Sequence, residues 1–161
     1  MANFTTTLAT KYITPLTDIE SSVGGFNVKF TIPYTQINNA SATGSADVQT
    51  VTLGATPAFW YADKALCNVT SAFAGCTALT MVVGTTSSTT AFVTSTSVLT
   101  AGAIPMSVNL PLLINATGTT SVSLVAVLTC ASGSSISALT TGSVDIYLSL
   151  RDLKATGGGI G

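Results

Sequence analysis

The sequence predicts an all-β fold, an antiparallel β-sandwich or jelly roll of about eight strands. Three observations predict it. Apolar residues recur with a period of two, the apolar runs are rich in β-branched residues, and clusters of Gly, Ser or Asn separate the runs. Helical patterns are nearly absent, because no window places apolar residues three and four apart and the five prolines interrupt the long stretches. A length of 161 residues fits one domain.

The clearest strand is expected over residues 26–32, where FNVKFTI places apolar residues, beginning with Phe26, on one side and polar residues on the other. Residues 1–25 are Thr-rich with sparse apolar positions, so we expect an N-terminal arm or an edge strand there. The predicted sandwich domain covers residues 26–154. Residues 155–161 form a Gly-rich C-terminal tail. Further strands are expected over 48–53, 58–73, 77–83, 104–114, 121–130 and 143–150.

The strand expected over residues 121–130 has two apolar faces. Val122, Leu124, Ala126, Leu128 and Cys130 share the face assigned to the core. The opposite face is also apolar because it carries Val125 and Val127. A strand without a polar face is usually covered on both sides. We therefore expect one sheet to pack its outer face against another copy of the chain.

Charged residues are scarce. They make up 7% of the chain, the net charge is −1, and no Asp, Glu, Lys, Arg or His lies between Lys64 and Asp145. Ser and Thr, roughly 29% of the chain, supply hydroxyl groups for solvation instead. The five Lys and Arg residues are scattered, so no nucleic-acid groove is expected. No apolar run is long enough to span a membrane, and no Sec-type signal peptide is recognisable, so synthesis in a cytoplasm is expected.

Neither an enzyme nor a metal or cofactor site is expected. General acid–base catalysis needs a titratable group held against the substrate, and the chain has no His. Asp63 adjoins Lys64, while Asp145 alternates outward beside Ser143 and Tyr147. No Ser lies in a nucleophile elbow. Without His or a close cysteine pair, the usual metal ligands are missing.

The three cysteines, Cys67, Cys76 and Cys130, are interpreted as small buried apolar residues. If Gly75 marks a hairpin turn, Cys67 lies six residues before the residue opposite Cys76, about 20 Å along an extended strand. This separation is too large for a disulfide. Cys67 and Cys76 are therefore expected to be free thiols, whereas the pairing state of Cys130 stays open.

Three consecutive aromatic residues, Phe59, Trp60 and Tyr61, form the main candidate binding segment. They could stack on a sugar ring. The favoured interpretation is that alternate members fill the core while Trp60, on the other face, anchors an interface. With Val125 and Val127 they complete the set of candidate interface residues.

Three short stretches resemble structural proteins of tailed bacteriophages. TSAFAG (70–75), a short turn and TMVVGT (80–85) are similar to a pattern in which one strand ends in AFxG and the next in VGT. LTTGSVDIYLSL (139–150) is similar to the closing strand of the same proteins. The resemblance covers residues 47–152 and points to head decoration, or cement, proteins and related fibre domains. The chain has no fibre extension or collagen-like repeat, which favours a compact decoration protein.

The resemblance implies a jelly-roll-like, non-enzymatic virion protein that forms a homotrimer. It would bind the major capsid protein on the outside of the phage head and stabilise the shell. The alternative is a carbohydrate-binding β-sandwich, either a phage adhesin or fibre domain or a lectin-like module, with Phe59, Trp60 and Tyr61 as its platform.

Overall fold

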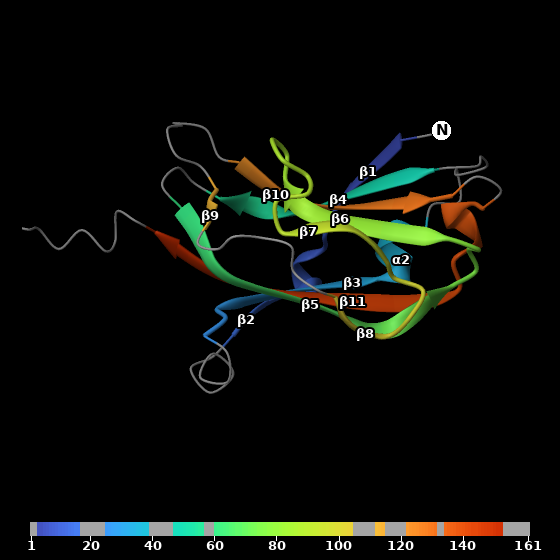
Figure 1. The fold of residues 1–161 in the computed structure, drawn as a ribbon, viewed down its shortest axis with the longest axis horizontal. Coiled ribbons are helices and arrows are strands. Elements are labelled where there is room, and N and C mark those ends of the chain that lie inside the picture. Colours follow the sequence, from blue (N-terminus) through green and yellow to red (C-terminus); the bar gives the residue numbers. More distant parts are fainter. Residues whose placement is uncertain are drawn as a thin grey trace, which may run out of the picture.

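The chain folds into two sheets that pack face to face, as Figure 1 shows. The structure is a computed structural model and describes residues 3–16, 25–38, 47–56, 60–104, 112–114, 122–131 and 134–152. The all-β sandwich predicted from the sequence is confirmed. The jelly-roll connectivity stays a prediction. Phe59 and the tail 155–161 lie outside the described residues.

The first sheet has five strands in the order β1-β4-β10-β6-β7. Their bounds are β1 Asn3–Thr7, β4 Val48–Thr56, β10 Val122–Cys130, β6 Leu79–Thr85 and β7 Val93–Ser97. β1 runs parallel to β4, and the other neighbours are antiparallel.

The second sheet has the order β2-β3-β11-β5-β8, with β9 as a further partner of β5. The bounds are β2 Ile13–Pro15, β3 Val28–Pro33, β11 Thr141–Asp152, β5 Trp60–Ala74, β8 Gly102–Ile104 and β9 Leu112–Leu113. All of its pairings are antiparallel. The described residues thus contain more strands than the eight expected. β2 is too short to show a periodicity in the sequence, and no strand was expected at β7. β8 and β9 contain the two ends of the strand expected over 104–114, of which residues 105–111 lie outside the described residues.

Helical structure within the described residues is confined to three short segments: η1 Thr10–Tyr12, α2 Tyr34–Ile37 and η2 Ile136–Ala138. α2 lies between the two layers in Figure 1, and its Ile37 is fully buried. The side-chain amide of the next residue, Asn38, donates a 2.7 Å hydrogen bond to the carbonyl of Leu139. This bond ties the end of α2 to the chain that leads into β11.

The N-terminal segment contributes an edge strand to each sheet. β1 lies at one edge of the five-stranded sheet, and β2 lies at one edge of the six-stranded sheet. Between them, the backbone amide of the buried Leu8 donates a 2.8 Å hydrogen bond to the Thr52 carbonyl. The segment therefore joins one side of both layers.

The core lies between the sheets and follows the alternation predicted for the two most regular strands. In β10, Leu124, Ala126, Leu128 and Cys130 are buried against the core. In β11, the alternate residues Val144, Ile146 and Leu148 are fully buried. Each fully buried Leu or Ile side chain stabilises the fold by about 1.5–3 kcal/mol, so the leucine and isoleucine residues of these two central strands contribute substantially to stability.

Phe26 departs from the alternation predicted for residues 26–32. β3 begins only at Val28, and the Phe26 ring packs against Tyr147, with 5.9 Å between the ring centroids. Tyr147 pairs with Lys29 and lies on the outer face of β11. The expectation that Phe26 shares the core face was wrong because the extended ladder does not reach it. Asn27 ends the ladder instead, since its side chain bonds both the amide and the carbonyl of Leu150.

Candidate functional site

The two outer faces of the sandwich differ in charge. The strands of the five-stranded sheet contain no Asp, Glu, Lys, Arg or His. The strands of the six-stranded sheet contain three acids and three bases: Asp63, Asp145, Asp152, Lys29, Lys64 and Arg151. The strands of the first sheet that the structure describes therefore offer a partner hydroxyl, amide and aliphatic groups and no charge.

The uncharged face is built in rows that cross the sheet. Thr5, Thr50, Val127 and Val82 are aligned in register across β1, β4, β10 and β6. Strands lie about 4.8 Å apart, and successive rows on one face are about 7 Å apart. The uncharged face comprises Asn3, Thr5, Thr7, Val48, Thr50, Thr52, Thr80, Val82, Ser97, Val127 and Thr129.

Val125 is covered by the chain itself. It is only 1% exposed, yet it does not belong to the cluster of buried hydrophobic residues that forms the core. Its partner on the neighbouring strand β6 is Gly84. A Cβ atom on Gly84 would lie 2.1 Å from the carbonyl oxygen of Ser88, so the segment after β6 folds directly over this position. The amide of Thr86 also bonds the carbonyl of Ser123. The expectation that another copy covers this strand is corrected at Val125, where residues 86–91 provide the cover.

Val127 remains partly accessible. It is half-buried and lies on the uncharged face between Thr50 and Val82. Of the two valines predicted to form an interface, Val127 is therefore the one that can meet a partner.

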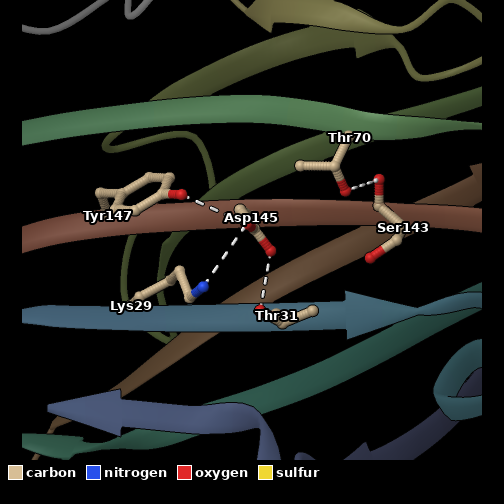
Figure 2. A network of polar contacts seen from close by, with 6 residues as sticks. All are labelled: Lys29, Thr31, Thr70, Ser143, Asp145 and Tyr147. Atoms are coloured by element: carbon tan, nitrogen blue, oxygen red, sulfur yellow. Dashed lines mark hydrogen bonds and ion pairs between the residues drawn. The ribbon is translucent and has the colours of Figure 1, made fainter.

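The opposite face carries a network centred on Asp145 (Figure 2). The Thr31 hydroxyl donates a 2.7 Å hydrogen bond to one oxygen of Asp145, and the Tyr147 hydroxyl donates a 3.2 Å bond to the other. The ammonium of Lys29 lies 3.8 Å from the second oxygen. Asp145 is 8% exposed, and its charge is already met by these groups. Nearby, the Thr70 hydroxyl donates to the Ser143 carbonyl.

Asp63 forms the second ionic contact of this face. The Nε of Arg151 lies 2.6 Å from Asp63 Oδ2. Burial opposes ionisation of Asp63, but hydrogen bonds from Ser149 and Arg151, with the charge of Arg151, hold its pKa below its usual range. Asp63 and Asp145 each have their own basic partner and do not form a carboxylate pair.

The bulge at Asp63 also sets the direction of the aromatic segment. Lys64 pairs with Ser149 and Ala62 with Leu150, so Asp63 is the extra residue of a β-bulge. Because the bulge reverses the alternation, Trp60 shares the core-side face with the fully buried Ala62, and Tyr61 lies on the outer face opposite Arg151. The expectation placed Trp60 on the outer face, and the structure reverses it.

Trp60 and Tyr61 are both half-buried and project to opposite faces of β5. Two rings on opposite faces cannot stack on the same sugar ring. The aromatic platform would thus lose one of its two described members.

The cysteines confirm the expectation of free thiols for Cys67 and Cys76, although Cys76 is less buried than expected. Cys67 and Cys130 are buried, Cys76 is half-buried, and all three are free thiols. Burial raises the pKa of Cys67 and of Cys130 to about 12. For Cys130, whose pairing state was left open, the structure shows a contact with Cys76 in which the two sulfur atoms lie 2.9 Å apart. The two residues are 54 positions apart in the chain, so sequence spacing gives no sign of this contact.

Within the described ranges, no group of three or more His, Cys, Asp or Glu residues is arranged to hold a metal ion. The same residues contain no helix that is both long and apolar enough to cross a membrane. Comparisons with protein families, curated proteins and solved structures return no match. The chemistry of the two faces is therefore the basis for the functional argument.

Proposed function

We propose that the chain is a non-enzymatic virion protein that decorates the outside of a phage head and stabilises the shell. The uncharged face supports this proposal. A shell-binding protein acts by mass action, because binding to the assembled state lowers its free energy relative to the open one. Such a role requires contact area and no titrating group.

The uncharged face suits repeated contacts between identical copies. Copies that sit side by side on a shell carry the same charges, so a contact surface without ions avoids repulsion. The charged residues that lie on strands belong to the other sheet, where Asp145 and Asp63 have basic partners in contact. We propose that the uncharged face binds the major capsid protein or a second copy within a homotrimer.

The test uses purified chain and empty shells of the virus that encodes it. Shell binding is measured by co-sedimentation for the wild type and for Thr50→Lys and Thr50→Glu, which place a charge of either sign at the centre of the uncharged face. Thr70→Lys, on the exposed side of β5, is the matched control. We expect both Thr50 variants to bind at least about tenfold more weakly, because a charge buried without a partner is unfavourable whatever its sign.

Three outcomes contradict the proposal. Wild-type chain that does not sediment with shells removes the decoration role. If the Thr50 variants bind shells as the wild type does and Thr70→Lys binds more weakly, the shell contact lies on the other sheet. The carbohydrate-binding alternative is supported if the wild type binds host polysaccharide but not shells, and if Tyr61→Ala abolishes the binding to polysaccharide. Melting temperatures of all variants control for loss of fold.

The homotrimer is tested separately by light scattering. We expect a trimer at micromolar concentration, and Thr50→Lys shifts it to monomer if the uncharged face forms the contact between copies. A stable monomer of the wild type contradicts self-association in solution.

A further inference from the structure

Cys76 and Cys130 form a close pair at one end of the sandwich. Their sulfur atoms are 2.9 Å apart, and a disulfide bond is about 2.05 Å long. The two atoms therefore need to approach by only about 0.9 Å for a bond to form. No other pair of cysteine sulfurs in the described residues is in contact.

The backbone holds both cysteines in place. Cys130 ends β10, where its amide donates a 2.9 Å hydrogen bond to the Asp47 carbonyl. Cys76 follows Gly75, whose φ of 108° favours glycine and whose Cα lies against the backbone of Ala138. The Cys76 thiol donates to the Ser135 carbonyl, 3.2 Å away. The approach of the two sulfurs is thus a property of the packed backbone and not of two free side chains.

We propose that Cys76 and Cys130 are a redox site that low-molecular-weight disulfides convert into an intramolecular disulfide. The Cys76 sulfur attacks one sulfur of the reagent disulfide, forms a mixed disulfide and releases the first thiol of the reagent. The Cys130 sulfur then attacks the Cys76 sulfur and releases the second. Two electrons pass from the protein sulfurs to the reagent disulfide, and the two thiol protons end on the two released thiols.

Accessibility gives the order of these steps. Cys76 is half-buried and can meet a reagent, whereas Cys130 is fully buried and can meet only Cys76. Burial, followed by the contact with Cys76, raises the pKa of Cys130 to about 12, so its thiolate is scarce near neutrality. The second step is therefore the slow one, and its rate rises with pH. This inference is independent of the proposed role on a shell.

The bond has a structural consequence. Cys76 lies in the connection from β5 of the six-stranded sheet to β6 of the five-stranded sheet, and Cys130 ends β10. A bond between them ties this connection to the neighbouring strand and encloses a loop of more than fifty residues in the unfolded chain. Closing a loop of this size restricts the unfolded state and raises the melting temperature by about 10 °C.

The experiment uses the full chain, purified with reductant and then incubated with oxidised glutathione at about pH 7 and about pH 9. Free thiols are blocked under denaturing conditions, intact mass is measured, and peptides are mapped. Cys67→Ala is the matched control, since it keeps the pair. Cys76→Ser removes one sulfur and keeps a donor for the Ser135 carbonyl.

The wild type and Cys67→Ala are expected to lose two thiols and the mass of two hydrogen atoms, faster at the higher pH, with a peptide linking Cys76 to Cys130. Cys76→Ser is expected to form no intramolecular bond. The proposal is overturned if the wild type keeps all its thiols, if it stops at a glutathione adduct, if the linked peptide contains Cys67, or if the oxidised form melts no higher than the reduced form. The peptide map of the oxidised wild type shows whether Cys76 and Cys130 are linked, so the test does not depend on the variants folding.

Discussion

Thr31 and Asp145 are joined across β3 and β11 by a 2.7 Å hydrogen bond from the threonine hydroxyl to a buried carboxylate. Hydrogen bonds to charged groups stabilise proteins by about 1.5–3 kcal/mol. We expect a double-mutant cycle of Thr31→Val and Asp145→Ala to give a coupling energy in this range, measured by urea unfolding.

The matched control for this cycle is Thr70→Val. In the wild type, the Thr70 hydroxyl donates to the Ser143 carbonyl and shares no partner with Asp145. Its effect on the free energy of unfolding should add to that of Asp145→Ala, with no coupling energy between the two. A third variant, Lys29→Met, should cost no more than about 1 kcal/mol, because the ion pair spans 3.8 Å at a partly exposed site. A larger loss for Lys29→Met than for Asp145→Ala would show that the ion pair, and not the hydrogen bonds, holds these strands together.

Gly84 is expected to tolerate no side chain. The Gly84→Ala methyl group would meet the Ser88 carbonyl oxygen and the backbone of Thr89 and Ala91. Displacing this backbone should lower the free energy of unfolding by about 1–3 kcal/mol and expose Val125.

Gly54 provides the control in the same sheet, because no atom lies within 4 Å of its added Cβ. Gly54→Ala should leave stability unchanged or raise it by up to about 1 kcal/mol. Equal melting temperatures for the two alanine variants would mean that residues 86–91 do not pack over Gly84 in solution.

The Asp63–Arg151 pair should stabilise the fold in a pH-dependent way. Because the pKa of Asp63 is lowered in the folded state, its contribution is present above its ordinary pKa of 3.8 and is lost as pH falls through the lower folded value. The difference in unfolding free energy between wild type and Arg151→Gln should be at most about 1 kcal/mol at neutral pH, since Arg151 is 52% exposed. It should vanish in acid, and a difference that persists in acid would assign the effect to packing of the arginine stem.

Cys67 should make stability fall in alkali. Its pKa rises from 9.0 to about 12 on folding because the thiol is buried. The stabilisation is therefore complete below about pH 9 and is lost as pH rises towards about 12, with a slope of about 1.4 kcal/mol per pH unit for one thiol. In Cys67→Ala, the free energy of unfolding measured with urea should fall less steeply with pH, by the contribution of this one thiol. Identical alkaline profiles for the two proteins would mean that the Cys67 thiol ionises as readily folded as unfolded.

The regular strands were predictable, and the irregular positions were not. In β10 and β11, the apolar residues two positions apart, Leu124 to Cys130 and Val144 to Leu148, lie on the buried face, so period two identified this face correctly. Val125, on the opposite face of β10, is buried as well. The direction of Trp60 was missed because the bulge at Asp63 is defined by the pairing of β5 with β11, a strand about 90 positions further along the chain, where Lys64 pairs with Ser149 and Ala62 with Leu150. A single sequence carries no signal for such a pairing.

In the candidate surfaces, too, the local sequence pattern was predictable and the contacts between distant segments were not. The absence of charge over residues 65–144 was visible in the sequence. This stretch contributes strands to both sheets, however, and the pairing that places the equally uncharged β1 and β4 beside β10 depends on strand order. The cover over Val125 and the contact between Cys76 and Cys130 depend on where turns return the chain. Both arise from backbone proximity between segments that no local pattern relates.

The position of β11 governs when the protein can fold during synthesis. β11 lies between β3 and β5, at the centre of the six-stranded sheet. Until residues 141–152 have left the ribosome, β3 and β5 have no common neighbour, and the inner face of the other sheet has an incomplete layer to pack on. The six-stranded sheet is therefore completed only when β11 inserts between two strands that were made before it, and until then the apolar faces of β3 and β5 lack their common neighbour.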